Sequence, residues 1–301
     1  MSHADERFAK NLASHDHPMT STLQFFEDTP IDAAPSSIEQ PQPTAMPACR
    51  AQVVALVSGN GGVGRSTLAT ALGSGLQRLG RAVTVLELDP QNALHLHFGL
   101  PHDTPGIGRA SLCKQPWGPI AQPGFCGCRV VVFGETDLQQ QEDLQRWLKQ
   151  DPQWLAQHLS RLGLSEQATV IIDTPAGNNV YLHQALHVAD RVVVVALADA
   201  ASLGALEQMQ RLLAPYLARP SAPRCHVFVN QLDEGSAFSL DMLDVFKQRL
   251  GEDGLEVIHR DPQISEALAF GEDPLDNEAV SLACDDIHGL CQLLDSPPNV
   301  P

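Results

Sequence analysis

Residues 58–67 read Ser58-Gly59-Asn60-Gly61-Gly62-Val63-Gly64-Arg65-Ser66-Thr67, and this stretch decides the fold. It follows the apolar run Gln52–Val57 and opens a segment with helical periodicity. That strand–loop–helix context is what a phosphate-binding loop (P-loop) needs. A glycine-rich turn without a ligand is the alternative, and the flanking strand and helix disfavour it. The predicted ligand-binding residues of the loop are Gly59, Asn60, Gly61, Gly62, Val63, Gly64, Arg65, Ser66 and Thr67.

The loop has a chemistry that follows from its residue types. Glycines allow the backbone to curl closely around phosphate oxygens, and the amides then point inward at the positive end of the following helix. The Ser66 hydroxyl is placed to hold a magnesium ion, and Thr67 can donate to a phosphate oxygen. Arg65 departs from a working P-loop, in which a lysine precedes the serine. It keeps the charge, but it is planar and bulkier than lysine.

Two later strands are predicted to end in carboxylates. Leu86-Glu87-Leu88-Asp89-Pro90 places Asp89 beside the loop, where it can orient water or join a magnesium shell. Val170-Ile171-Ile172-Asp173 is an apolar run ending in an aspartate, the Walker B pattern, in which Asp173 holds magnesium through water. We predict Asp89 as the catalytic residue, and the metal site as Ser66, Asp89 and Asp173.

From Ala51 onward, short β-branched runs alternate with longer amphipathic ones. Predicted strands are Gln52–Val57, Ala82–Leu88, Arg129–Phe133, Ala168–Asp173, Arg191–Ala198, Cys225–Asn230 and Leu255–Ile258. Predicted helices are Ser66–Leu79, Leu138–Gln150, Val180–Val188, Leu203–Leu217, Leu240–Leu250 and Val280–Leu294. The strands are nearly continuous in Val, Ile and Leu, as expected when both faces are buried. The pattern predicts an α/β fold with a doubly wound, mostly parallel sheet.

Composition argues against several classes of protein. The 301 residues carry 36 acidic and 19 basic side chains, a formal charge of −17. This disfavours a non-specific DNA binder, which needs a basic face, and direct attraction to an anionic membrane. No apolar run approaches the roughly 20 residues that span a bilayer, and the first residues lack an apolar signal core. We expect a cytoplasmic protein that contacts neither nucleic acid nor lipid directly.

The chain divides into three parts by composition. Residues 1–50 are rich in Pro, Ser, Gln and acidic side chains and predict a disordered or partner-binding tail. Within it Leu23-Gln24-Phe25-Phe26-Glu27-Asp28, followed by Ile31, is either a docking peptide or part of a solvated tail. Residues 51–295 form the predicted P-loop domain, and 296–301 a frayed end. His95 and His97 are expected to be exposed polar residues near a switch loop rather than a metal half-site.

These motifs, in this order, resemble the MinD/ParA branch of P-loop ATPases, the deviant Walker A group. Phe228-Val229-Asn230 is similar to the family's strand that ends in the adenine-reading asparagine. Ile258-His259-Arg260-Asp261 is similar to its late adenine-side loop. The resemblance implies ATP and Mg²⁺ as cofactors, with Asn230, His259 and Asp261 near the base. From the residues alone, His259 lines the pocket or merely packs beside it.

Within that branch the chain most resembles the BcsQ (YhjQ) family, encoded with bacterial cellulose synthases. The similarity rests on Leu86–Leu100, on Val131–Gly134 with the Gln-rich helix after it, and on the stretch from Val257. It implies a homodimer formed around sandwiched ATP. It also implies a role at the cellulose synthase complex, with small partners of the BcsR and BcsE kind and recruitment to the inner membrane through partners.

Two further positions depart from the MinD/ParA pattern. Asn60 stands where the branch has a signature lysine that reaches across the dimer to the partner's phosphates, and Glu87 replaces the first aspartate of the DxD pair. A cation of this kind is worth roughly 10³–10⁵ in rate. The prediction is therefore a nucleotide-dependent regulator or scaffold with slow or absent hydrolysis. The alternative is an active positioning or partition ATPase of the ParA/MinD type.

Overall fold

The computed structural model describes residues 51–251, 254–276 and 281–296. The predicted tail over residues 1–50, its aromatic segment and the chain end after Ser296 lie outside these residues. So does Val280, the predicted first residue of the last helix.

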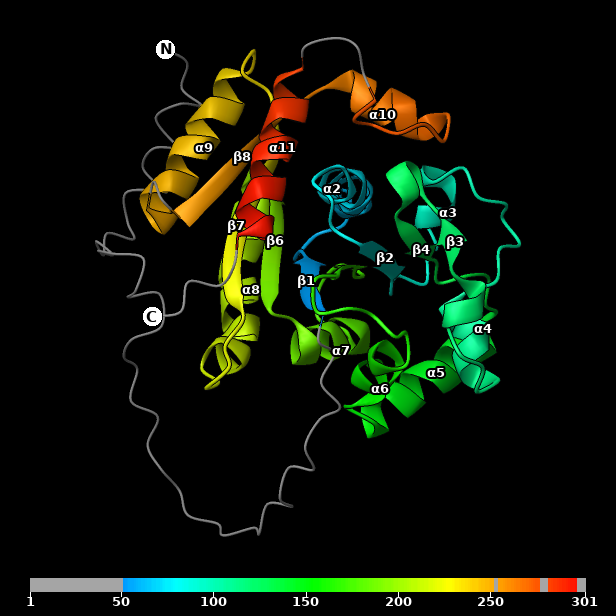
Figure 1. The fold of residues 1–301 in the computed structure, drawn as a ribbon. Helices are drawn as coiled ribbons and strands as arrows, with labels where there is room; N and C mark the ends of the chain where they lie inside the picture. The colour runs from blue at the N-terminus through cyan, green and yellow to red at the C-terminus, as the bar shows by residue number, and fades with distance from the viewer. Residues whose placement is uncertain (1–50, 252–253, 277–280, 297–301) are drawn as a thin grey trace, which may run out of the picture.

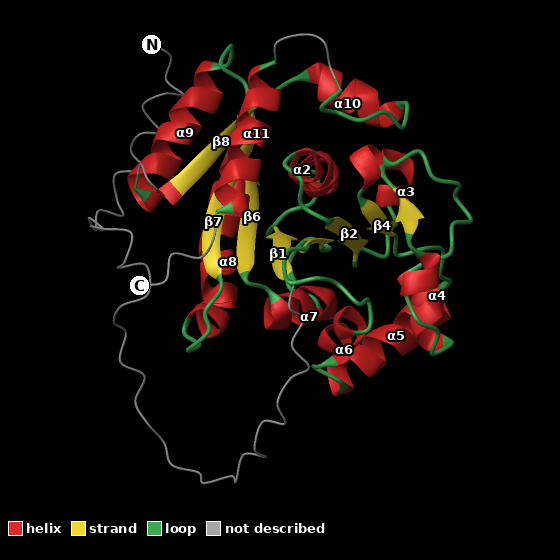
Figure 2. Cartoon of the chain, in the orientation of Figure 1, coloured by secondary structure: helices red, strands yellow, loops and turns green. Residues whose placement is uncertain are grey.

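Eight strands form one sheet, in the order β3-β4-β2-β5-β1-β6-β7-β8 (Figures 1 and 2). Their bounds are β1 Gln52–Val57, β2 Val83–Glu87, β3 Gln122–Pro123, β4 Arg129–Val131, β5 Thr169–Asp173, β6 Arg191–Leu197, β7 Arg224–Leu232 and β8 Leu255–His259. Every pair is parallel except β3 with β4. The central strands β1, β2 and β5 are buried almost throughout, as their β-branched sequences predicted. The predicted doubly wound sheet is confirmed.

Helices cover both faces of the sheet (Figure 1). Their bounds are α2 Arg65–Arg78, α3 Leu94–His97, α4 Ile107–Leu112, α5 Leu138–Gln150, α6 Trp154–Ser160, α7 Val180–Val188, α8 Ala200–Leu217, α9 Ala237–Leu250, α10 Pro262–Ala269 and α11 Leu282–Asp295. One apolar core joins the sheet to α2, α3, α10 and α11, and the other joins it to α4 through α9. The short elements β3, α3, α4, α6 and α10 were not predicted, because runs this short carry little periodicity.

The connections place the predicted site at the switch point of the sheet. The chain leaves β1 for β2 on one side, and the later crossover from β5 passes β1 to reach β6 on the other side, so the connections run in opposite directions about β1. Open α/β sheets bind ligands in the crevice that this reversal leaves beyond the carboxyl ends of the strands. Residues 58–64 leave β1 at that crevice, and Asp173 ends β5 beside them.

Candidate functional site

The glycines of the loop after β1 differ in the space around them: Gly59 and Gly64 have no room for a side chain, whereas Gly61 has. Gly64 has φ +89°, and an added Cβ would lie 2.4 Å from the Asn230 side chain. A Cβ on Gly59 would lie 2.6 Å from that of Ala205 on α8, whereas one on Gly61 would meet nothing within 4 Å. Gly64 also caps α2 without a side-chain hydrogen bond. The amides of the first turn therefore stay available to an anion.

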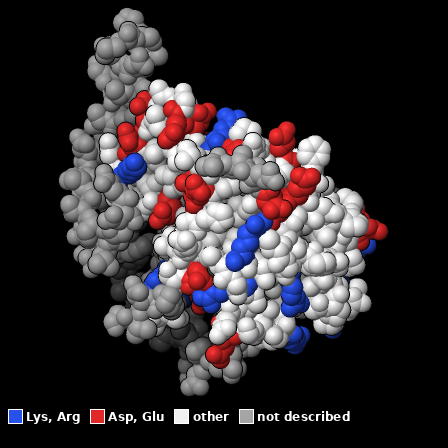
Figure 3. Space-filling view, turned by 45° about the horizontal axis from the view of Figure 1, so that its top comes forward, with Lys and Arg blue, Asp and Glu red and all other residues white. Residues whose placement is uncertain are grey.

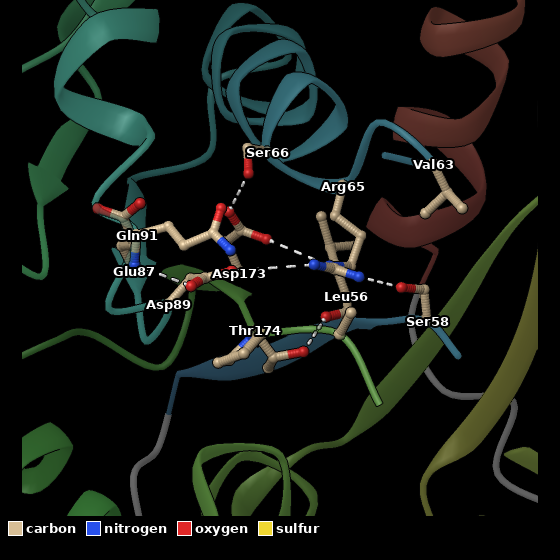
Figure 4. A network of polar contacts seen from close by, with 12 residues as sticks. Leu56, Ser58, Val63, Arg65, Ser66, Glu87, Asp89, Gln91, Asp173 and Thr174 are labelled. Atoms are coloured by element: carbon tan, nitrogen blue, oxygen red, sulfur yellow. Dashed lines mark hydrogen bonds and ion pairs between the residues drawn. The ribbon is translucent and has the colours of Figure 1, made fainter. Parts of the chain in front are cut away.

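Arg65 folds back over its own loop instead of pointing outward (Figure 4). Its Nη1 donates to the Ser58 hydroxyl and, at 3.2 Å, to the Asn60 carbonyl. The guanidinium also lies 3.9 Å from Asp89 Oδ2 and 3.8 Å from Asp173 Oδ1. Only 8% of the residue is exposed, and burial lowers the pKa of Arg65 against the opposing effect of the two carboxylates. Arginine remains charged in proteins, so the site holds a built-in cation.

Ser66 and Asp173, two of the predicted metal ligands, are in contact. The Ser66 hydroxyl donates to Asp173 Oδ2 at 2.6 Å. The other carboxylate oxygen, Asp173 Oδ1, is buried without a hydrogen-bond partner, and so is Arg65 Nε. An oxygen donor set with an unsatisfied buried carboxylate suits Mg²⁺, which prefers such ligands. These residues fit a magnesium ion, which would compete with the Arg65 guanidinium for the same carboxylates.

Asp89, the predicted catalytic residue, lies at the edge of the same group. Its Oδ1 accepts a hydrogen bond from the Gln91 amide at 3.0 Å, and its Oδ2 faces Arg65. The carboxylate is therefore directed at the interior of the site rather than at solvent (Figure 4). Its catalytic role stays a prediction.

Glu87 has a structural role that sequence reasoning missed. Its carboxyl is fully buried and accepts hydrogen bonds from the amides of Leu94 at 2.9 Å and Phe133 at 3.1 Å. It thereby joins the start of α3 to the end of β4. Burial, together with the nearby Asp173, raises the pKa of Glu87 to about 8. The sequence hinted at this role only by placing an acidic residue inside an apolar strand, two residues before Asp89, and it did not show which amides the carboxyl would bind.

The free energy of unfolding is expected to fall as the pH rises between the pKa of Glu87 in the unfolded chain and its higher pKa in the folded protein. Glu87 keeps its proton up to about pH 8 in the folded state, while in the unfolded chain it ionises near its ordinary value of 4.5. Between about pH 4.5 and 8 the unfolded chain has therefore lost a proton that the folded protein still holds, so the free energy of unfolding falls as the pH rises through this window and levels off above it. Urea unfolding should show a decline approaching about 1.4 kcal/mol per pH unit. Glu87→Gln should flatten this slope, and an unchanged slope would contradict the assignment.

Asn230, on β7, holds the P-loop in place through a hydrogen bond. Its amide donates to the Val63 carbonyl at 2.9 Å, and its side chain is buried against Gly64. The next residue, Gln231, has φ +57°, and the pairing of β7 with β8 shifts register there. This bulge turns Asn230 toward the loop. Its reading of a base stays a prediction.

A pocket of about 250 Å³ lies beside Asn230, where a base is predicted to bind. It is lined by Thr67, Asn230 and residues 258–262, among others. His259 borders it, with Nδ1 2.8 Å from Asp286 and Nε2 3.3 Å from Glu234. Burial lowers the pKa of His259, but the two carboxylates outweigh it and the net shift is upward. The residue both lines the pocket and is fixed by its neighbours.

Asp261 has a local structural task. Its side chain caps α10 by accepting from the Gln263 amide at 2.8 Å, and it also accepts from the Ser281 hydroxyl. These contacts do not test whether Asp261 also meets a nucleotide, and that contact stays a prediction. Arg260 is exposed, 3.5 Å from Asp233.

The expectation that His95 is an exposed polar residue is wrong. Its side chain is 6% exposed in α3, and its Nδ1 contacts the Asn92 carbonyl. Leu94 in the same turn is fully buried, and α3 contacts α2 and α10, so this face of the turn is covered. His97 is half-buried, with Nδ1 3.5 Å from the Thr70 hydroxyl.

The family of the chain follows from comparison with known proteins. A family model described as "Cellulose biosynthesis protein BcsQ" matches residues 51–293. The chain belongs to the BcsQ family. BcsQ of Escherichia coli (strain K12) is 27% identical over 237 residues, covering 78% of this chain and 90% of the relative. BcsQ of Salmonella typhimurium is 26% identical over 244 residues, with the same coverage. The resemblance inferred from the motifs is confirmed.

Solved structures show the same fold at low sequence identity. MinD of Pyrococcus horikoshii, complexed with Mg-ADP, is 19% identical with a TM-score of 0.64, covering 81% of this chain and 96% of that one. A Cyanothece McdA variant in complex with ATP is 16% identical with a TM-score of 0.68, covering 84% and 100%. Cobyrinic acid a,c-diamide synthase of Mycobacterium smegmatis, with ADP and magnesium, is 18% identical with a TM-score of 0.64, covering 81% and 94%. The chain therefore has the MinD/ParA P-loop fold.

Proposed function

We propose that this BcsQ-family protein binds Mg-ATP and acts as a nucleotide-dependent dimeric regulator or scaffold of bacterial cellulose biosynthesis, with slow or absent hydrolysis. The observation that carries the proposal is the P-loop between β1 and α2, with Ser66 in hydrogen-bond contact with Asp173 and Arg65 laid across Asp89 and Asp173. The ligand site is retained, while the two positions that drive rapid turnover are altered.

The residues of the site have separate tasks in this proposal. Backbone amides at the start of α2 would hold the phosphates. Ser66 and Asp173 would hold magnesium, which supplies charge neutralisation to the phosphate oxygens when bound. Asp89 would orient the attacking water. Arg65 must leave the two carboxylates before the ion can bind, which slows entry of the nucleotide.

Slow hydrolysis follows from position 60. The Asn60 side chain is neutral and short, and the backbone carbonyl of the residue accepts a hydrogen bond from Arg65. It cannot bring a positive charge to the phosphates of a partner subunit. A nucleotide that is held but not cleaved stabilises the assembly that binds it, by mass action. The dimer would then be long-lived.

Partners and location rest on family resemblance. We infer components of the BcsR and BcsE kind as partners, and recruitment to the inner membrane through them. Among the described residues no helix is long and apolar enough to cross a bilayer. The sequence carries no Lys or Arg after Arg260, whereas a membrane-binding amphipathic tail of the MinD kind uses basic residues.

The competing function is an active partition or positioning ATPase. It needs rapid, partner-stimulated hydrolysis and a DNA or lipid surface. On the face shown in Figure 3, basic side chains are separated by acidic and uncharged ones. Neither the charge of −17 nor the loss of the lysines favours this alternative.

Light scattering on a sizing column tests the proposal. With Mg-ATP the mass is expected to double and to stay doubled for hours, whereas with ADP the protein should elute as a monomer. Asp173→Asn removes one carboxylate charge from the magnesium site and should leave the protein monomeric with ATP. A monomer in both nucleotides, with none retained, would overturn ATP as the switch.

A further inference from the structure

An apolar groove lies between α8 and α9, over the amino-terminal halves of β7 and β8, away from the P-loop mouth. Its volume is about 430 Å³, within the range of ligand pockets. Leu213 and Leu217 of α8 form one wall, and Leu250 and Leu255 the other. Figure 1 shows the two helices flanking these strands.

The floor of the groove is an inward-facing position that nothing covers among the described residues. Cys225 alternates with Val227 and Val229 on β7 and so points to the face that α8 and α9 cover, where both valines are buried. Cys225 is nevertheless exposed. Apolar side chains line the groove around it, among them Leu213, Leu217 and Val227. Burial of an apolar side chain against such a surface is favourable, because it removes apolar area from water.

We propose that this groove holds the segment from Leu23 to Ile31 of the same chain, with Phe25 and Phe26 as its anchors. Aromatic side chains are effective anchors in an apolar pocket, because each buries a large apolar area. Within residues 1–50, which lie outside the described structure, they form the adjacent aromatic pair.

The chain enters β1 at the end of the sheet where the groove lies, the end at which the parallel strands begin. Val54 of β1 pairs with Arg191, and Arg191 pairs with Arg224, which precedes Cys225. The groove is therefore two strands from β1, about 10 Å across the sheet. The 25 residues from Phe26 to Ala51 can span about 80 Å when extended, so the segment reaches the groove easily. A tether of this length also keeps its effective concentration high.

The groove also touches the support of the P-loop. Leu206 and Met209 of α8 line it, and the same two residues line the space beneath Gly59 and Asn60. The docked segment would thus lie against the helix on which the P-loop rests.

Photocrosslinking in the full chain tests the proposal. Phe25→p-benzoylphenylalanine should give cross-links to residues 206–227 or 250–256, and the same substitution at Phe8, an aromatic residue of the tail outside the segment, should give about tenfold fewer. Mixing isotope-labelled and unlabelled chains separates the sources. Cross-links within one chain support the proposal. Cross-links between chains would assign the groove to a second copy, and cross-links no more frequent than from Phe8 would show it empty; either would overturn it.

Hydrogen exchange gives a second measurement without a bulky probe. Phe25→Ala with Phe26→Ala should speed exchange in residues 206–217 and 223–227 by about threefold or more, because the covering segment is released. Phe8→Ala should leave these rates unchanged. Equal rates in all three proteins would contradict docking.

Discussion

Asn60→Lys combined with Arg65→Lys is expected to raise ATP turnover by about a thousandfold or more over the parent. Lysine at 60 would restore a cation that reaches the partner's phosphates as the dimer forms. Lysine at 65 would replace a guanidinium that now spans Asp89 and Asp173 with a compact charge that leaves those carboxylates to magnesium. Phosphate release at saturating Mg-ATP measures the effect.

Single changes separate the two contributions. Arg65→Lys alone should tighten Mg-ATP binding with little gain in turnover, because the trans charge is still missing. Asn60→Gln together with Arg65→Lys is the matched control, since it lengthens the side chain at 60 without adding charge, and it should stay slow. If the double lysine protein turns over no faster than the parent, these substitutions are not what silences hydrolysis.

Gly64→Ala is expected to reduce Mg-ATP affinity more than tenfold and to lower the free energy of unfolding by about 1–3 kcal/mol. Its φ of +89° is unfavourable for a side chain, and the new Cβ would lie 2.4 Å from Asn230 Nδ2. Relief requires moving either the α2 cap or the asparagine that holds Val63. Nucleotide titration and urea unfolding of the same preparation measure both effects.

Gly61→Ala is the matched control in the same loop. A Cβ there meets nothing within 4 Å, and Gly61 is not among the residues with positive φ. The free energy of unfolding should change by less than about 0.5 kcal/mol. Equal destabilisation by the two substitutions would show that the close approach at Gly64 is not what the loop depends on.

Local sequence was sufficient for most of the architecture. The β-branched run Gln52–Val57 gave β1 with its observed bounds, and the amphipathic segments gave α7 and the Gln-rich helix over Leu138–Gln150 with theirs. The glycine-rich stretch between a strand and a helix located the P-loop, because its spacing is a property of consecutive residues. The carboxylates at strand ends placed Asp89 and Asp173 beside it, because parallel strands end at one edge of the sheet.

The tertiary structure alone decided what those side chains do. Arg65 could be expected to face a phosphate, yet it lies across Asp89 and Asp173 because two carboxylates from different strands converge on it. Glu87 joins two backbone segments that are 39 residues apart in sequence, Leu94 and Phe133, and Asn230 supports a loop 167 residues away. The sequence by itself determined the fold class, the P-loop and the family. It could not determine these contacts, because they depend on distances between strands that only the folded sheet brings together.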